Sequence, residues 1–161
     1  VDPVVVNKGG KLTDEQRQDF QKLANNAYTF LSREMAKDYT LVTEAGPGTV
    51  RIQLVILDAS PSSPVRNILS SVTPIGIGLN LITYAATGAQ SGVGDITVEF
   101  KVSDSQTGDL LAAALDKRVG GKNPDGTFDT WANANAALEY WAKRVRFVGC
   151  QMRGGANCEK P

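Results

Sequence analysis

Apolar residues recur every three or four positions in two long stretches of the chain, and this spacing predicts two amphipathic helices. The first helix is expected at about 14–37, where Thr13 and Gln16 match the Thr-x-x-Gln pattern of a capping box. The second is expected at about 128–148, with Gly149 as its stop signal. The apolar stripe consists of Phe20, Leu23, Ala24, Ala27, Phe30, Leu31 and Met35 in the first helix, and of Trp131, Ala134, Leu138, Trp141, Ala142, Val145 and Val148 in the second.

Alternation of apolar and polar residues predicts strands in the other parts of the chain. Residues 49–57 and 95–103 alternate with a period of two, and 110–119 is interpreted as the return strand after a short turn. The run 39–43 is expected to form a hairpin with 49–57, because a Gly-Pro-Gly turn signal lies between them. The β-rich residues 1–6 begin abruptly, so we expect them to be a truncated N-terminal strand.

These elements place the chain in the α+β class. Their order is β-α-β-β-(uncharged segment)-β-β-α, which predicts one mainly antiparallel sheet of about five strands with the two long helices on one face. The sequence shows no internal repeat and no interdomain linker, and a length of 161 residues suits one domain. We therefore expect residues 1–161 to form a single domain.

Residues 67–94 form a run of 28 residues without a charged side chain, in a chain of which 21% is charged. Three interpretations remain open. We favour a buried crossover packed on the sheet, because a chain of this size needs the apolar area for its own core. A membrane-spanning helix is least favoured, because Pro74 and several glycines interrupt the run. The third interpretation is a loop that contacts a partner or a membrane, and its candidate interface residues are Ile75, Ile77, Leu79, Leu81 and Tyr84.

Charge and composition narrow the chemistry that the chain can perform. It has 17 basic and 17 acidic residues, so no net charge attracts a nucleic acid over a distance. It has no histidine, which excludes Ser-His-Asp and Cys-His triads and the HExxH zinc motif. We expect no catalytic residue, no cofactor, no metal site and no nucleic-acid partner. An enzyme that uses carboxylates such as Asp104, Asp109 or Asp116 is the least favoured alternative.

The two cysteines, Cys150 and Cys158, flank a glycine-rich stretch near the C-terminus. A loop of this kind can close into a disulfide without strain, and we expect a structural disulfide that closes the tail 149–161. Free thiols and a redox pair remain alternatives, whereas a zinc site lacks its further ligands. A disulfide indicates an oxidising compartment. Because the chain starts at Val1 with neither Met nor a signal peptide, we expect the mature or trimmed form of an exported protein.

Three stretches and one helix of the chain are similar to a known family. The stretches are VDPVVV at 1–6, YTLVTEAGPGTVRIQLVILDAS at 39–60 and TGAQSGVGDITVEFKVSDSQTGDLLAAALDKRVG at 87–120, and the helix contains Trp131 and the Trp141-Ala-Lys-Arg144 motif. With them the chain resembles an uncharacterised family of Gram-negative envelope lipoproteins, a domain of unknown function of the thirty-three thirteen type. The resemblance implies a signal peptide and a lipidated cysteine upstream of Val1, and it supplies no catalytic residues. The order of elements also resembles the curli-secretion lipoprotein and the TolB N-terminal domain, at the level of the fold alone.

Together, these observations predict a non-enzymatic lipoprotein domain of the periplasm or outer membrane. We expect it to act through protein-protein contacts, including self-assembly into an oligomer, and to reach the membrane through the lipid anchor that the resemblance implies. The alternative is a carrier of a small apolar ligand or lipid. Its candidate pocket lies between the helices and the sheet, near Trp131, Trp141 and residues 75–86.

Overall fold

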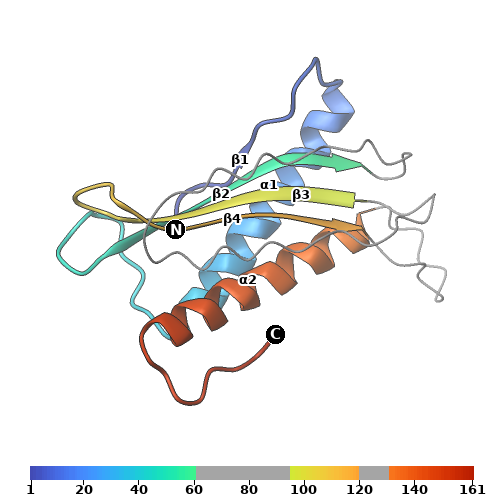
Figure 1. Ribbon diagram of the computed structural model, residues 1–161. Helices are drawn as coiled ribbons and strands as arrows, with labels where there is room; N and C mark the ends of the chain where they lie inside the picture. Colours follow the sequence, from blue (N-terminus) through green and yellow to red (C-terminus); the bar gives the residue numbers. More distant parts are fainter. Residues whose placement is uncertain (61–94, 120–130) are drawn as a thin grey trace.

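The computed structural model describes residues 1–60, 95–119 and 131–161, and Figure 1 shows the arrangement of its elements. They follow in the order β1 (Val5–Val6), α1 (Asp14–Met35), β2 (Val50–Ser60), β3 (Asp95–Asp104), β4 (Leu110–Val119) and α2 (Ala132–Met152). The fold is α+β with one sheet and two helices, as the sequence predicts. The candidate interface residues Ile75, Ile77, Leu79, Leu81 and Tyr84 lie outside the described residues.

α1 begins where the capping-box pattern predicts it. The backbone N–H of Gln16 donates to Thr13 Oγ1 at 3.2 Å, and the backbone N–H of Thr13 donates to Gln16 Oε1 at 2.9 Å. These bonds satisfy backbone donors that the start of a helix leaves without partners. The predicted apolar stripe is buried from Phe20 to Met35, except for Phe30, which is only partly buried.

α2 extends further than the sequence predicts. It continues to Met152, and the chain leaves the helix at Arg153, followed by Gly154 with a φ of 73°. The prediction that Gly149 ends the helix is therefore wrong. A Cβ at Gly149 would lie 2.5 Å from the hydroxyl oxygen of Tyr39, so this glycine allows the tyrosine to pack closely on the helix.

Within the described residues the sheet has four strands in the order β1-β2-β3-β4, and it is mixed because β1 is parallel to β2 while the other pairs are antiparallel. This differs from the prediction of about five mainly antiparallel strands, because one predicted strand is missing and β1 pairs in parallel. Residues 39–43 form no strand, so the predicted hairpin with 49–57 does not form. β2 pairs with β3 instead, with Leu54 opposite Phe100. The eleven residues of β2 and the ten of β3 offer many more ladder bonds and side-chain pairs than a five-residue run can.

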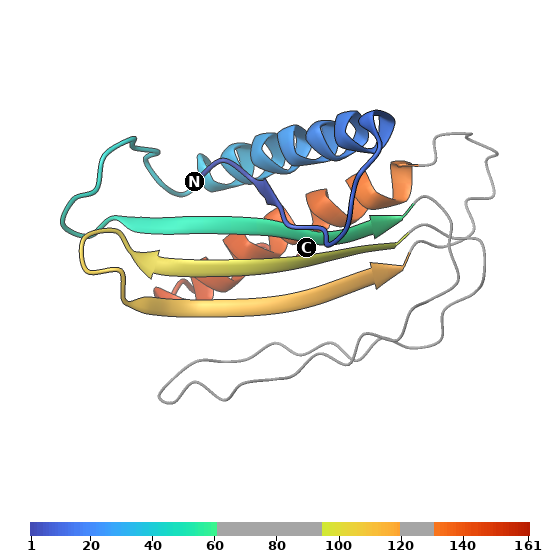
Figure 2. The same ribbon diagram turned by 90° about the horizontal axis from the view of Figure 1, so that it is seen from above.

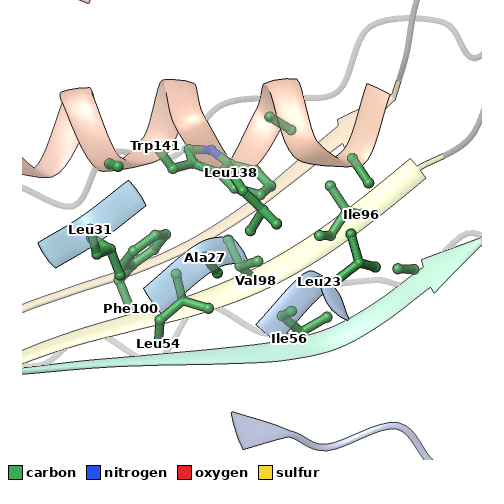
Figure 3. Close-up of a cluster of buried hydrophobic side chains, with 14 of the residues drawn as sticks. Leu23, Ala27, Leu31, Leu54, Ile56, Ile96, Val98, Phe100, Leu138 and Trp141 are labelled. Atoms are coloured by element: carbon green, nitrogen blue, oxygen red, sulfur yellow. The ribbon is translucent and has the colours of Figure 1, made fainter. Parts of the chain in front are cut away.

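The core lies between both helices and one face of the sheet. Figure 3 shows Leu23, Ala27 and Leu31 of α1 and Leu138 and Trp141 of α2 among the side chains of the strands. The strands contribute Leu54 and Ile56 from β2 and Ile96, Val98 and Phe100 from β3. Side chains at alternate positions share one face of a sheet, so the helices cover the face to which these residues belong. Figure 2 shows β2, β3 and β4 side by side, with α2 (orange to red) crossing behind them.

Candidate functional site

An open apolar cavity of about 680 Å³ lies between the sheet and the C-terminal half of α2, and we call it the β4–α2 groove. β2, β3 and β4 form its floor, α2 covers it, and residues 39–42, which follow α1, form one wall. Side chains that represent these surfaces are Leu41, Ile52, Phe100, Ala112, Tyr140 and Val148. The volume lies within the range of roughly 300–1,000 Å³ that is typical of small-molecule sites.

Small side chains on β4 create this groove. Ala112 is opposite Val102 and Ala114 is opposite Phe100, so both alanines point toward α2 from the face that carries the core. β3 fills its part of that face with large side chains, whereas β4 offers methyl groups at these two positions. Val145 of α2 lines the gap above them without closing it. The alanines of β4 are thus the local cause of the groove.

The lining of the groove includes the Trp141 indole and the Asp116 carboxylate. Trp141 is 3% exposed, and its ring packs edge-on against Phe100 with 6.3 Å between the ring centroids. Its Nε1–H donates to Asp116 Oδ2 at 2.6 Å. The other Asp116 oxygen accepts a hydrogen bond from the backbone N–H of Lys117 at 2.8 Å. The carboxylate is thereby fixed in direction, and it satisfies the one polar group of a buried indole.

The mouth of the groove is apolar and exposed. The described part of the chain has eight large apolar side chains that are exposed, and five of them line the groove: Leu41, Val42, Val50, Leu111 and Met152. We call these five residues the apolar rim. Their exposed fractions range from 38% for Leu111 to 63% for Met152. A contiguous group of exposed apolar side chains around a cavity is typical of a surface that binds an apolar ligand or partner.

Three charged residues line the groove, and they differ in their pairing. Asp116 is bonded to the indole. Arg153 stacks on the ring of Tyr39, with 4.1 Å between the guanidinium carbon and the ring centroid. Arg144 is half-buried, and its guanidinium carbon lies 5.5 Å from the centroid of the Phe147 ring. Of the three, Arg144 is the side chain whose charge has the fewest contacts within the described residues.

A disulfide and a group of ion pairs hold the C-terminal tail beside the groove. Cys150 lies in the last turn of α2, not in a loop as expected, and it forms the predicted disulfide with Cys158. Arg146 donates hydrogen bonds to Asp38 at 2.8 Å and to Glu159 at 2.7 Å. These contacts connect α2 and the tail with the segment after α1 that forms the groove wall.

The Arg146 guanidinium lowers the pKa of both carboxyls that it binds. Its hydrogen bond is the main cause that holds the pKa of Asp38 below 3.8 and the pKa of Glu159 below 4.5. The two carboxylates in turn raise the pKa of Arg146, which stays charged. Because both carboxylates are exposed, solvent screens these pairs, and their role is to position the tail more than to stabilise the whole fold.

The structure separates the two tryptophans of the expected pocket. Trp141 lines the groove, whereas Trp131 lies directly before α2 and packs against Phe20 of α1, with 6.2 Å between the ring centroids. Ten residues of helix correspond to a rotation of about 1,000°, which is about 80° short of three full turns. The two side chains therefore diverge, and the groove contains one tryptophan.

The acidic residues Asp104 and Asp109 lie at the β3–β4 turn, away from the groove lining. Asp104 accepts backbone hydrogen bonds from Gln106 at 2.8 Å and Thr107 at 2.9 Å, and these bonds lower its pKa. This is the role that aspartate has in tight turns. Within residues 1–60, 95–119 and 131–161, no three Cys, Asp or Glu side chains are grouped as metal ligands. Neither helix of these ranges combines the length and the hydropathy needed to cross a bilayer.

The sequence alone does not single out the apolar rim as part of a site. The rim joins residues from four separate parts of the chain, so no local pattern reports it. The available signal is the pair Ala112 and Ala114 at alternate positions of a strand. Such a pair indicates room above the strand for a ligand or a close neighbour.

The fold and the groove define a class of protein: an α+β domain in which, among the described residues, two helices cover one face of a four-stranded sheet and leave an apolar groove open beside β4. The chain belongs to the family DUF3313, described as a protein of unknown function, whose family model matches residues 1–145. This confirms the family that the sequence resembles. The matched range ends before the disulfide between Cys150 and Cys158. No curated protein matches the chain at a significant level.

Proposed function

We propose that this chain is a non-enzymatic domain of a Gram-negative envelope lipoprotein and that it binds an apolar ligand, such as a lipid chain, in the β4–α2 groove. The apolar rim around an open cavity of about 680 Å³ is the observation that supports this function best. Apolar area exposed to water is unfavourable by about 25 cal/mol per Å². A ligand that covers the rim and enters the groove recovers this free energy, which gives binding its driving force.

The location in the periplasm or outer membrane is part of the proposal and has two supports. The family resemblance implies a lipid anchor upstream of Val1, and the disulfide between Cys150 and Cys158 is typical of proteins in oxidising compartments. An anchor keeps the domain close to a membrane, where lipid chains are available at high local concentration.

A variant that fills the groove tests this function. Ala112→Leu places a larger apolar side chain on the floor of the groove, whereas Ala136→Leu makes the same change at an exposed position of α2 that does not line the groove and serves as a matched control. The neutral fluorescent probe N-phenyl-1-naphthylamine measures binding by titration. We expect saturable binding to the wild type and to Ala136→Leu, and binding at least about tenfold weaker to Ala112→Leu, a difference of about 1.4 kcal/mol.

Native mass spectrometry of the protein purified from an envelope fraction is the second measurement, and a retained lipid is the expected result. Absence of both a retained lipid and saturable probe binding would contradict the proposal. Equal probe affinity in the Ala112→Leu and Ala136→Leu variants would also contradict it, because binding would then take place outside the groove.

The exposed apolar rim also favours a second candidate function, which is contact with a protein partner or with another copy of this chain. Size-exclusion chromatography with light scattering measures self-association, and a pull-down from an envelope fraction measures partner binding. Val42→Asp, on the rim, should abolish either contact, whereas Val5→Asp changes an exposed valine away from the rim and should preserve it. A strict monomer that captures no partner contradicts this second function.

A further inference from the structure

Two arginines beside the β4–α2 groove have no carboxylate partner among the described residues. Arg144 lines the groove and contacts an aromatic ring. Arg118 of β4 stacks on Tyr140, with 3.5 Å between its guanidinium carbon and the ring centroid. Tyr140 and Arg144 are four residues apart on α2, so they are neighbours on one side of the helix. Two guanidinium groups thus lie along the same side of the groove.

The other charges near the groove are already engaged. Asp116 accepts hydrogen bonds from the Trp141 indole and from a backbone N–H. Arg153 stacks on an aromatic ring and lies 3.9 Å from a carboxylate oxygen of Asp38. Both donors to Asp116 are neutral, so its negative charge remains, but Arg144 and Arg118 outnumber it. The net charge of these three groups is therefore positive, and it stands next to an apolar surface.

We propose that the ligand of the groove is an anionic amphiphile, whose head binds Arg144 while its chain lies over the alanines of β4. The assignment presupposes that the groove binds an apolar ligand, as proposed above. A half-buried guanidinium has lost part of its hydration, and the oxygens of a carboxylate or phosphate head restore those hydrogen bonds in a bidentate geometry. The chain of the same molecule covers the apolar rim. One ligand thereby satisfies both features of the groove that the protein itself leaves unsatisfied.

Displacement of bound N-phenyl-1-naphthylamine from the full chain tests the charge of the head. The competitors are dodecanoate, dodecanol and dodecylamine, used below their micelle concentrations, because they share one chain and differ in charge. We expect dodecanoate to displace the probe at a concentration about tenfold lower than dodecanol, which corresponds to about 1.4 kcal/mol. We expect dodecylamine to be the weakest competitor.

Arg144→Gln should reduce the preference for dodecanoate over dodecanol to less than about twofold, and Arg144→Lys should retain part of it, because lysine keeps the charge but loses the bidentate geometry. Lys143→Gln removes the same charge from the exposed neighbouring position and is the matched control, so it should keep the preference. The preference is the ratio of the two competitors within one variant, so any change in the affinity of the groove for the neutral probe cancels from it.

The possible failures are distinguishable. Equal displacement by dodecanoate and dodecanol, with saturable probe binding, overturns the anionic head and leaves the proposed function standing. Tighter binding of dodecylamine that Asp116→Asn abolishes overturns it in favour of a cationic head at Asp116. A wild-type protein that binds no probe at all overturns the proposed function itself.

Discussion

The hydrogen bond between Trp141 and Asp116 should contribute measurably to stability, and Asp116→Ala tests this contribution. Trp141 is 3% exposed and its Nε1–H donates to Asp116 at 2.6 Å, so the substitution leaves a buried donor without its acceptor. A loss of this kind typically costs about 1–3 kcal/mol. Because Asp116 borders the open groove, water can enter the position of the missing carboxylate, and we expect a cost of about 1–2 kcal/mol.

Urea denaturation followed by far-ultraviolet circular dichroism measures the free energy of unfolding without using the fluorescence of the affected tryptophan. Asp116→Asn keeps an oxygen acceptor and is the matched control, with an expected cost of less than about half that of Asp116→Ala. In a Trp141→Phe background the donor is absent, so Asp116→Ala should cost less than about 0.5 kcal/mol there. An equal cost of Asp116→Ala in both backgrounds would refute the reasoning.

The C-terminal tail and the packing of α2 supply three further tests. Cys158→Ser opens a loop whose ends are 8 residues apart, and thermal unfolding should show that the free energy of unfolding falls by up to about 2.5 kcal/mol. Unchanged stability would mean that the tail does not constrain the fold. Arg146→Met removes the cation that lowers the pKa of Asp38 and Glu159 in the folded state. The stabilisation from these carboxylates is complete above their ordinary pKa values of 3.8 and 4.5, and it is lost as the pH falls below them. The urea midpoint of the variant should therefore depend less on pH below about 4.5 than that of the wild type. Parallel curves of midpoint against pH would contradict this. Gly149→Ala places a methyl group 2.5 Å from the Tyr39 hydroxyl oxygen, so this tyrosine, which lines the groove, must shift and probe binding should weaken. Alanine gains about 1 kcal/mol over glycine inside a helix, so the net change in stability should be small, and unchanged probe binding would count against this packing contact.

The helices could be predicted from the sequence because their causes are local. The capping box at Thr13 and the apolar stripe of α1 are contained within one stretch of chain, and the structure has both. The prediction of the end of α2 is wrong because Gly149 does not end the helix but allows another side chain to pack closely on it. The glycine accommodates Tyr39, which is distant in sequence, and no pattern within the helix reports that contact.

The sheet and the groove depend on contacts between distant segments. Alternation identifies 49–57 and 95–103 as strands, but it does not state that they pair with each other. Likewise, the alanines of β4 are visible in the sequence, whereas their position beneath α2 depends on the strand order. The apolar rim is still harder to predict from the sequence, because residues such as Leu41 and Met152 meet only when the whole chain is folded.

β2 and β3 are neighbours in the sheet although residues 61–94 separate them in the chain, and Ser60 is paired with Asp95. The two ends of that segment are therefore adjacent partners in an antiparallel ladder, which a turn of only a few residues is able to join. The entropic cost of closing such a connection changes by only about 0.6 kcal/mol for each doubling of its length. The β2–β3 pairing itself therefore requires no more than a short turn between Ser60 and Asp95. A chain with a short hairpin turn in place of 61–94 would consequently test whether the candidate interface residues of that segment take part in a partner contact, because it lacks them and keeps the residues of the apolar rim.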